Sequence, residues 1–126
     1  MRTVKRGELY FADLGTGIGS EQWGERPVLI VQNDKGNLYS PTTIVLPLTT
    51  QVHKSKGLPV HVILDKMEGL DQTSAVMAEQ IVTIDKSRLQ RRIGAIMDKH
   101  IFMDIDRAIQ ISLALYEWQN RHHFQK

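Results

Sequence analysis

The chain has 126 residues, the size of one domain with a core of its own, and its lack of cysteine excludes disulfides and thiolate metal sites. Sixteen Lys and Arg residues against fourteen Asp and Glu residues give a net charge of +2, which is too small to diagnose nucleic-acid binding. No apolar run reaches the length of a membrane span or a signal peptide, so we expect a cytoplasmic protein without a membrane segment.

The first half of the chain alternates strand-like segments with loops. Residues 8–14 are rich in strand formers, and 15–25 hold four glycines, which is typical of a long loop. The apolar run 27–32 indicates a buried strand, 33–37 has the composition of a turn, and 43–48 predicts another strand.

The second half continues this pattern. It predicts a polar loop at 51–57, a strand at 59–64, a loop at 66–72, and one long strand or two with a bend at 74–84. Asp85 has the position of an N-cap before a short helical turn, and residues 92–96 could form a final strand.

The last element is an amphipathic helix with Asp98 as its N-cap. Its apolar face is expected to hold Ile101, Ile105, Ala108, Ile109, Ser112 and Leu115 or Tyr116, over about five turns. We assign residues 1–118 to the domain and 119–126 to a polar tail. Short strands with one terminal helix predict a small, strongly bent β-barrel or sandwich.

Two polar residues at strand ends are candidates for a site. Arg26 precedes Pro27, which biases it toward an extended backbone, and its guanidinium could bind a phosphate. An ion pair with Glu21 or Glu25 is the alternative. Thr49 ends the next strand and could face the same opening, although a threonine there is usually a turn residue.

Other motifs are less specific. The glycine run 15–19 follows a strand as a dinucleotide-binding loop would, but Gly24 and Pro27 prevent the helix that such a loop requires. Glu79 and Gln80 interrupt an apolar segment, and on a strand they would face opposite sides. They either serve a site or form a structural hydrogen bond that holds the loop 15–25.

The histidines show no metal-binding spacing such as HExxH. His61 is interpreted as a packed or rim residue rather than a base. We therefore expect no metal and no cofactor, and any catalysis would depend on arginine and threonine side chains, with glutamate as a further candidate.

The sequence closely resembles MazF/PemK toxins, and most closely their Gram-positive branch. The resemblance rests on segments 4–14, 19–22, 25–34 and 40–42, and it continues through Leu58–Pro59, His61, Glu79–Gln80, 83–86 and 109–115. It covers about residues 4–116. The block from Gly19 to Asp34 carries the most specific part of the match.

This resemblance implies a mainly β fold with a C-terminal helix, an SH3-like barrel of the CcdB/Kid/MazF toxin type. It implies the toxin of a type II toxin–antitoxin system, a homodimer that cleaves single-stranded RNA at specific sequences without metal and is inhibited by a MazE-like antitoxin. Arg26 and Thr49 match the family's catalytic pair, and the expected products are a 2′,3′-cyclic phosphate and a 5′-hydroxyl. The RNA-binding positions are Phe11, Ser20, Gln22, Glu79 and Gln80, with Trp23 as an additional stacking residue.

The chain departs from its relatives at three positions. Val82 replaces an arginine that is usual in close relatives, Trp23 stands where glycine is commoner, and Gly57 is an additional glycine. The recognised RNA sequence therefore cannot be transferred from the family. Two alternatives stay open: a CcdB-like toxin that binds gyrase, and a non-catalytic barrel that binds RNA or an antitoxin.

Overall fold

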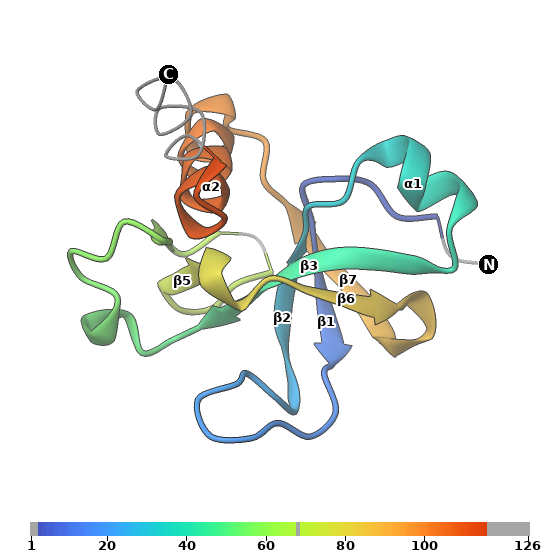
Figure 1. Ribbon diagram of the computed structural model, residues 1–126, viewed down its shortest axis with the longest axis horizontal. Helices are drawn as coiled ribbons and strands as arrows, with labels where there is room; N and C mark the ends of the chain where they lie inside the picture. Colours follow the sequence, from blue (N-terminus) through green and yellow to red (C-terminus); the bar gives the residue numbers. More distant parts are fainter. Residues whose placement is uncertain (1–2, 68, 116–126) are drawn as a thin grey trace, which may run out of the picture.

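A computed structural model describes residues 3–67 and 69–115, so the predicted tail and Tyr116 lie outside the described residues. The elements are, in chain order, β1 (Glu8–Asp13), β2 (Glu25–Ile30), α1 (Asp34–Tyr39), β3 (Thr42–Thr49), η1 (Val52–Lys54), β4 (His61–Leu64), β5 (Ser74–Met77), η2 (Ala78–Gln80), β6 (Val82–Asp85), η3 (Lys86–Arg88), β7 (Leu89–Ala95) and α2 (Lys99–Ser112). Strands are joined mostly by loops and short helical turns, and α2 is the last element (Figure 1).

All strand pairs are antiparallel, in the order β4-β5-β3-β2-β1-β7, with β6 also paired to β3. The long strand β3 is central because β2 pairs along one edge, while β6 and then β5 share the other. Within the described ranges β4 and β7 do not pair, so the sheet is open. The mainly β fold with a C-terminal helix is confirmed, but strand pairing does not close the predicted barrel.

A loop contact brings the two ends of this open sheet together. Gly69, between β4 and β5, lies so close to β7 that an added Cβ would be 1.7 Å from the carbonyl oxygen of Ile93. Gly69 also has a φ of +89°, a conformation that suits glycine. The two ends of the sheet therefore meet through a contact between backbone segments and not through strand pairing.

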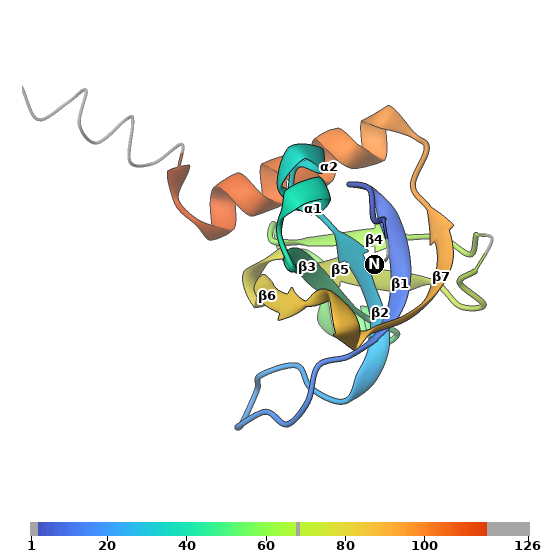
Figure 2. The ribbon, with the colours of Figure 1, turned by 90° about the vertical axis from the view of Figure 1, so that its right-hand side faces the viewer.

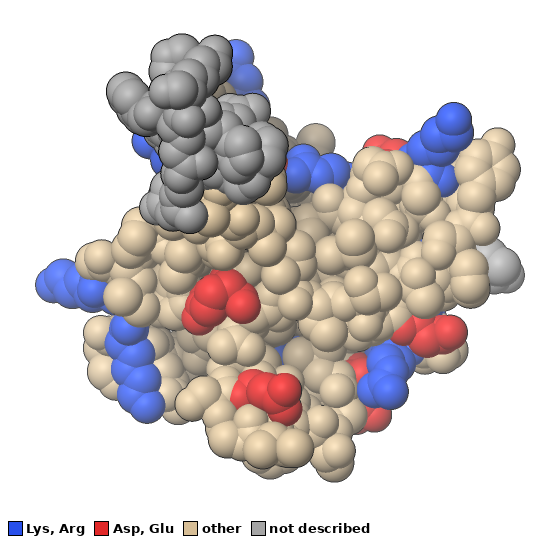
Figure 3. All heavy atoms as spheres, in the orientation of Figure 1, with Lys and Arg blue, Asp and Glu red and all other residues tan. Residues whose placement is uncertain are grey.

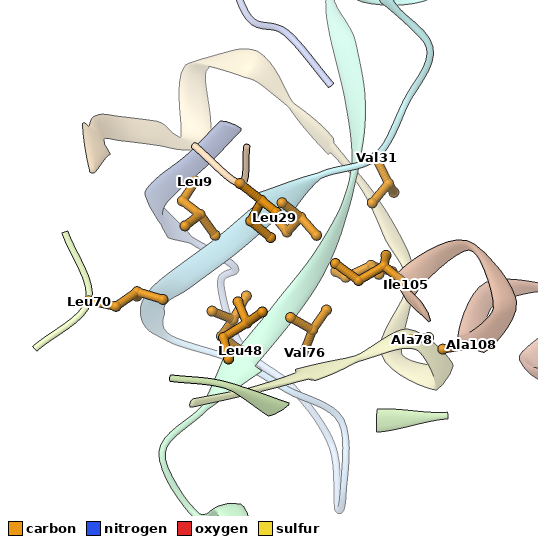
Figure 4. Packing of buried hydrophobic residues seen from close by; sticks show 12 residues of the cluster. Leu9, Leu29, Val31, Leu48, Leu70, Val76, Ala78, Ile105 and Ala108 are labelled. Carbon is orange, nitrogen blue, oxygen red and sulfur yellow. The ribbon is translucent and has the colours of Figure 1, made fainter. Parts of the chain in front are cut away.

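Alternating side chains fill a core on each face of the sheet. In β2, Leu29 packs into the cluster that α2 covers, while Val28 and Ile30 pack into the cluster on the opposite face. Ile105 and Ala108 of α2 contribute to the first cluster, as their spacing predicted (Figure 4). This burial fixes the face of every residue in β1, β2 and β3.

Two helices correct the expectations from the sequence. Residues 33–37 were expected as a turn, but α1 begins at Asp34, because the Asn33 side chain caps it by accepting from the amide of Gly36 at 2.7 Å. The N-cap of α2 is Asp98, as predicted, yet α2 ends at Ser112 after 14 residues, which is shorter than five turns. Leu115 therefore lies beyond this helix and is 52% exposed.

The segment 74–84 forms two strands with a bend between them, one of the two forms that the sequence allowed. The bend is the 3₁₀ turn η2. Asp85 caps η3 by accepting from the amide of Ser87, as predicted. In the part of the chain that the structure describes, no helix is long and apolar enough to cross a membrane.

Candidate functional site

Three adjoining hollows lie where the β1–β2 connection, the end of β3 and η2 meet. The first, of about 250 Å³, is lined by Arg26, Pro27, Leu48, Thr49, Gln51 and Ser74. The second, of about 320 Å³, adds Ser20, Gln22, His61, Glu79 and Gln80 to Thr49 and Gln51. The third, of about 260 Å³, is lined by Gln22, Glu79 and Gln80 again and extends to Val82. Because neighbouring hollows share residues, we treat them as one surface, called the groove.

Arg26 is held at one end of the groove by two carbonyl groups. Its Nε donates to the carbonyl of Trp23 at 3.1 Å, and its Nη1 donates to the carbonyl of Leu48 at 3.2 Å. Partial burial lowers the pKa of the Arg26 guanidinium by desolvation, although an arginine still carries its charge near neutral pH. The Nη2 amino group remains for a ligand.

The alternative ion pair of Arg26 is absent among the residues described. Glu21 accepts from the amide of Ile18 at 2.6 Å, and Glu25 accepts from Gln90 at 2.8 Å. Neither carboxylate is within ion-pair distance of Arg26. The positive charge at this end of the groove is therefore not neutralised by an acidic side chain, which suits an anionic ligand.

Thr49 ends β3 beside Arg26 and lines both the first and the second hollow. Its hydroxyl oxygen accepts from the amide of Gln51 at 3.1 Å, which leaves the hydroxyl hydrogen free to donate. The predicted pair, Arg26 and Thr49, thus lines one hollow with two kinds of hydrogen-bond donor.

Glu79 and Gln80 do not face opposite sides, because η2 is a 3₁₀ turn and not a strand. Both side chains line the second and third hollows. Glu79 accepts from His61 at 2.8 Å, whereas Gln80 reaches the carbonyl of Ser20 at 3.5 Å, which is long for a hydrogen bond. The Gln80 contact is the structural alternative that the sequence allowed, a tie to the glycine-rich loop, but a weak one.

Phe11 and Trp23 occupy different positions from the other predicted residues. Phe11 lies between Tyr10 and Ala12, whose side chains enter the core on one face, so Phe11 points to the other. Its ring packs under the Arg91 guanidinium, 5.0 Å from the ring centre. Trp23 is 56% exposed in the loop and contacts Arg26 through its backbone carbonyl.

The structure therefore brings Ser20, Gln22, Arg26, Thr49, Glu79 and Gln80 together. Phe11 does not line the three hollows, although its strand partner Pro27 lines the first one. Sequence reasoning missed Gln51, Lys54 and Ser55, which also line the groove. Their only signal was the polar composition of the segment 51–57. His61 is both packed, with a side chain 8% exposed, and at the rim of the groove, in agreement with its interpretation.

The charge distribution gives no single basic patch on the face seen in Figure 3, where blue side chains lie at the margins and two acidic groups lie nearer the centre. Within the groove, Arg26 and Lys54 are positive, and Glu21 and Glu79 are negative. No three His, Asp or Glu side chains gather into a possible metal site in the described ranges. Selective binding here would depend on individual polar contacts.

The geometry defines a small antiparallel β protein whose groove combines a fixed arginine, a threonine hydroxyl and three adjoining hollows with polar side chains. The chain belongs to the family of PemK-like, MazF-like toxins of type II toxin–antitoxin systems, whose model matches residues 5–113. It is similar to the endoribonuclease EndoA of Bacillus subtilis, with 51% identity over 91% of this chain and 98% of the relative. The endoribonuclease MazF of Staphylococcus saprophyticus is 46% identical over 90% and 93% of the two chains.

Solved structures agree. A mycobacterial endoribonuclease matches with a TM-score of 0.73 and 25% identity over 90% of this chain and 94% of the other. A mycobacterial endoribonuclease in complex with its cognate antitoxin matches with a TM-score of 0.70 and 27% identity, over 90% of this chain and 96% of the other. MazF of Deinococcus radiodurans shares the fold, with a TM-score of 0.76 at 20% identity over 90% and 99%. The predicted family is confirmed, and both curated relatives come from Gram-positive genera.

Proposed function

We propose that this toxin is a sequence-specific, metal-independent endoribonuclease that binds single-stranded RNA in the groove. The observation that carries the proposal is the pairing of Arg26, fixed by two carbonyls and without a carboxylate partner, with the free hydroxyl donor of Thr49 in one hollow. Two relatives at 46% and 51% identity are named endoribonucleases, which supports the same assignment.

The chemistry follows from what RNA supplies. The 2′-hydroxyl attacks the neighbouring phosphorus and loses its proton, the bond from phosphorus to the 5′ oxygen breaks, and that oxygen gains a proton. The products are a 2′,3′-cyclic phosphate and a 5′-hydroxyl. Arg26 and Thr49 would stabilise the negative charge that builds on the phosphate oxygens, and removing one such donor typically slows a reaction by roughly 100- to 1000-fold.

Fixation of Arg26 matters because a donor that is already oriented needs no reorganisation when charge develops. With Nε and Nη1 bound to the two carbonyls, the two N–H donors of Nη2 are left for phosphate oxygens. Burial also shifts the pKa of Arg26 downward, which is the direction that helps a group donate a proton to the leaving oxygen. Even so, we assign Arg26 mainly to charge stabilisation, because an arginine remains a poor acid.

The remaining groove residues would bind the bases on either side of the cut. Ser20, Gln22, Glu79 and Gln80 offer donors and acceptors to the edges of unstacked bases, the mode by which proteins read single-stranded RNA. Trp23 would stack on a base from the loop. Phe11 stays a prediction as an RNA contact, and it would require RNA to extend beyond Pro27 at the edge of the first hollow.

We further propose a cytoplasmic homodimer that is inhibited by a MazE-like antitoxin occupying the groove. A structural relative crystallised with its cognate antitoxin supports the antitoxin partner. Sedimentation equilibrium of the purified toxin tests the dimer. Competition between a candidate antitoxin and labelled RNA tests occupation of the groove, since an antitoxin bound elsewhere would not displace RNA.

The deciding experiment uses the purified protein and a long mixed-sequence RNA in EDTA, beside Arg26→Ala and Thr49→Ala. We expect discrete cuts by the parent and strongly reduced cutting by both variants, with cyclic phosphate ends. Arg107→Ala, an exposed arginine on α2, is the matched control and should cut like the parent. Intact RNA with a folded parent would refute the proposal, and a gyrase assay on the same preparation would test the CcdB-like alternative.

A further inference from the structure

The groove contains a chain of three side chains that starts in the protein interior. His61 begins β4, and its Nδ1 lies 2.7 Å from the Ser55 hydroxyl while its Nε2 lies 2.8 Å from Oε2 of Glu79. Ser55 is only 3% exposed, the His61 side chain 8%, and the Glu79 side chain 38%. Burial therefore decreases in steps from Ser55 to the carboxylate in the groove.

Backbone turns place these three groups together. Ser55 is the C-cap of η1, and successive bonds from the amide of Leu58 to the carbonyl of Ser55 and from the amide of His61 to the carbonyl of Leu58 fold this segment back toward β4. His61 pairs with Met77, the residue directly before η2, so its ring lies beside the turn that carries Glu79. The loop 51–57 and η2 are thus connected through one imidazole ring.

The direction of the hydrogen bonds follows from the groups involved. A carboxylate only accepts, so Nε2 of His61 donates to Glu79, and in the neutral ring Nδ1 then accepts from the Ser55 hydroxyl. Both ring nitrogens have partners, and the ring cannot turn over without losing both bonds. Oε2 of Glu79 is held, and the rest of its carboxylate faces the groove.

In a groove that binds RNA, a fixed carboxylate can make favourable contacts with only some parts of the ligand. It would repel phosphate, but it accepts hydrogen bonds from the N–H groups on the edges of unpaired bases. We infer that His61 is a positioning residue, which holds the Glu79 carboxylate through the Ser55–His61–Glu79 chain so that it selects one base of the RNA by its N–H donors. This inference rests on the proposed function and adds residues that the catalytic step does not use.

The test is a cleavage map on a randomised RNA library for the parent and four variants: His61→Ala, His61→Gln, Ser55→Ala and Glu79→Gln. We expect His61→Ala and Glu79→Gln to reduce discrimination at the same single base position by roughly tenfold, the usual worth of a hydrogen bond to a charged group. His61→Gln, which restores an N–H near the place of Nε2, should keep most of the discrimination. Ser55→Ala should lose part of it.

Two comparisons separate positioning from a general structural role. The double variant His61→Ala with Glu79→Gln should discriminate no worse than Glu79→Gln alone, because both changes remove one interaction. His53→Ala, an exposed histidine in η1, is the matched control and should leave the map unchanged. Thermal unfolding of each variant identifies those that fail to fold; if His61→Ala is among them, His61→Gln and Ser55→Ala decide.

The inference is overturned if the folded His61 or Ser55 variants cut every site more slowly with unchanged base preference, or if the effects of His61→Ala and Glu79→Gln add. A parent that cuts RNA while the variants keep its preference refutes only this inference. A folded parent that cuts no RNA refutes the proposed function and removes this inference with it.

Discussion

The Arg26 guanidinium donates to the carbonyl oxygen of Leu48 at 3.2 Å, and Leu48 is joined directly to Thr49. One hydrogen bond therefore sets the position of both proposed catalytic residues relative to each other. Any movement of the end of β3 would shift the donor of Thr49 and one anchor of Arg26 together.

Arg26→Lys tests whether orientation matters as well as charge. Lysine keeps the positive charge but lacks the planar fork that bonds Trp23 and Leu48 while facing a ligand. We expect kcat/KM on a fluorogenic RNA in EDTA to fall by roughly 100-fold or more. RNA affinity, measured with a substrate that lacks the attacking 2′-hydroxyl, should change far less. Equal cleavage by Lys and Arg would show that charge alone suffices.

Trp23→Ala separates the role of the Trp23 backbone carbonyl from the role of its indole side chain. The Arg26 anchor is the carbonyl of Trp23, which survives the substitution, while the exposed indole is lost. Loss of one base–aromatic stack costs roughly 1–3 kcal/mol of binding. We expect a higher KM with little change in kcat. A large fall in kcat at saturating RNA would instead mean that the indole shapes the catalytic end.

Val82→Arg restores a charge at the far end of the groove. Val82 is 39% exposed and lines the third hollow beside Gln22 and Glu79. If the new arginine contacts one phosphate, the slope of log affinity against log salt should steepen by about 0.7. Binding of uncleavable RNA at several salt concentrations measures this slope. An unchanged slope would place the RNA backbone away from β6.

Gly69→Ala and Gly57→Ala form a matched pair for stability. Both glycines have positive φ, +89° and +80°, but a Cβ at Gly57 meets nothing within 4 Å, whereas one at Gly69 collides with Ile93. Gly57→Ala should cost about 1–2 kcal/mol of unfolding free energy, the penalty of left-handed backbone alone. Gly69→Ala should cost clearly more in urea unfolding. Equal costs would mean that β7 moves away easily.

Asp85→Asn tests a charge-dependent cap. Hydrogen bonds from the side chain and the backbone of Ser87 lower the pKa of Asp85 from its usual value of 3.8. The folded state thus favours the ionised carboxylate, so its stabilisation is present above about pH 3.8 and is lost as the pH falls through the lower folded value. The variant should have a lower Tm than the parent at pH 6, and the difference should shrink as the pH falls below 3.8. A difference that keeps its size there would have another cause.

Local patterns in the sequence predicted the elements whose cause is local. The Asp98 cap of α2, the burial of Ile105 and Ala108, and a strand at the apolar run of β2 depend on neighbouring residues and were predicted correctly, although β2 begins and ends two residues earlier than expected. The helix α1 was missed because its cap, Asn33, is also a typical turn residue. The contact that no local pattern reveals is the hydrogen bond from Nζ of Lys86 to the carbonyl of Asn37, which joins α1 to a residue far along the chain.

The site divides in the same way. That Arg26 and Thr49 line one opening was predictable from their positions at strand ends, and their catalytic role stays a prediction from the resemblance. The alternation rule failed at Glu79 and Gln80, because it assumes a strand where the chain forms a 3₁₀ turn. Ser55 and His61 become neighbours only through the fold of the segment that joins β3 to β4, so their chain could not be predicted from spacing.

The weak tie between Gln80 and Ser20 has a consequence for how a substrate arrives. In the described part of the chain it is the one hydrogen bond that joins residues 16–22 to anything outside the β1–β2 connection, and this connection projects on the side away from α2 (Figures 1 and 2). Residues 16–22 can therefore move after one long hydrogen bond breaks, while Trp23, which anchors Arg26, and the sheet stay in place. A long transcript can then be laid in from the side at any point along its length, with no free end to thread.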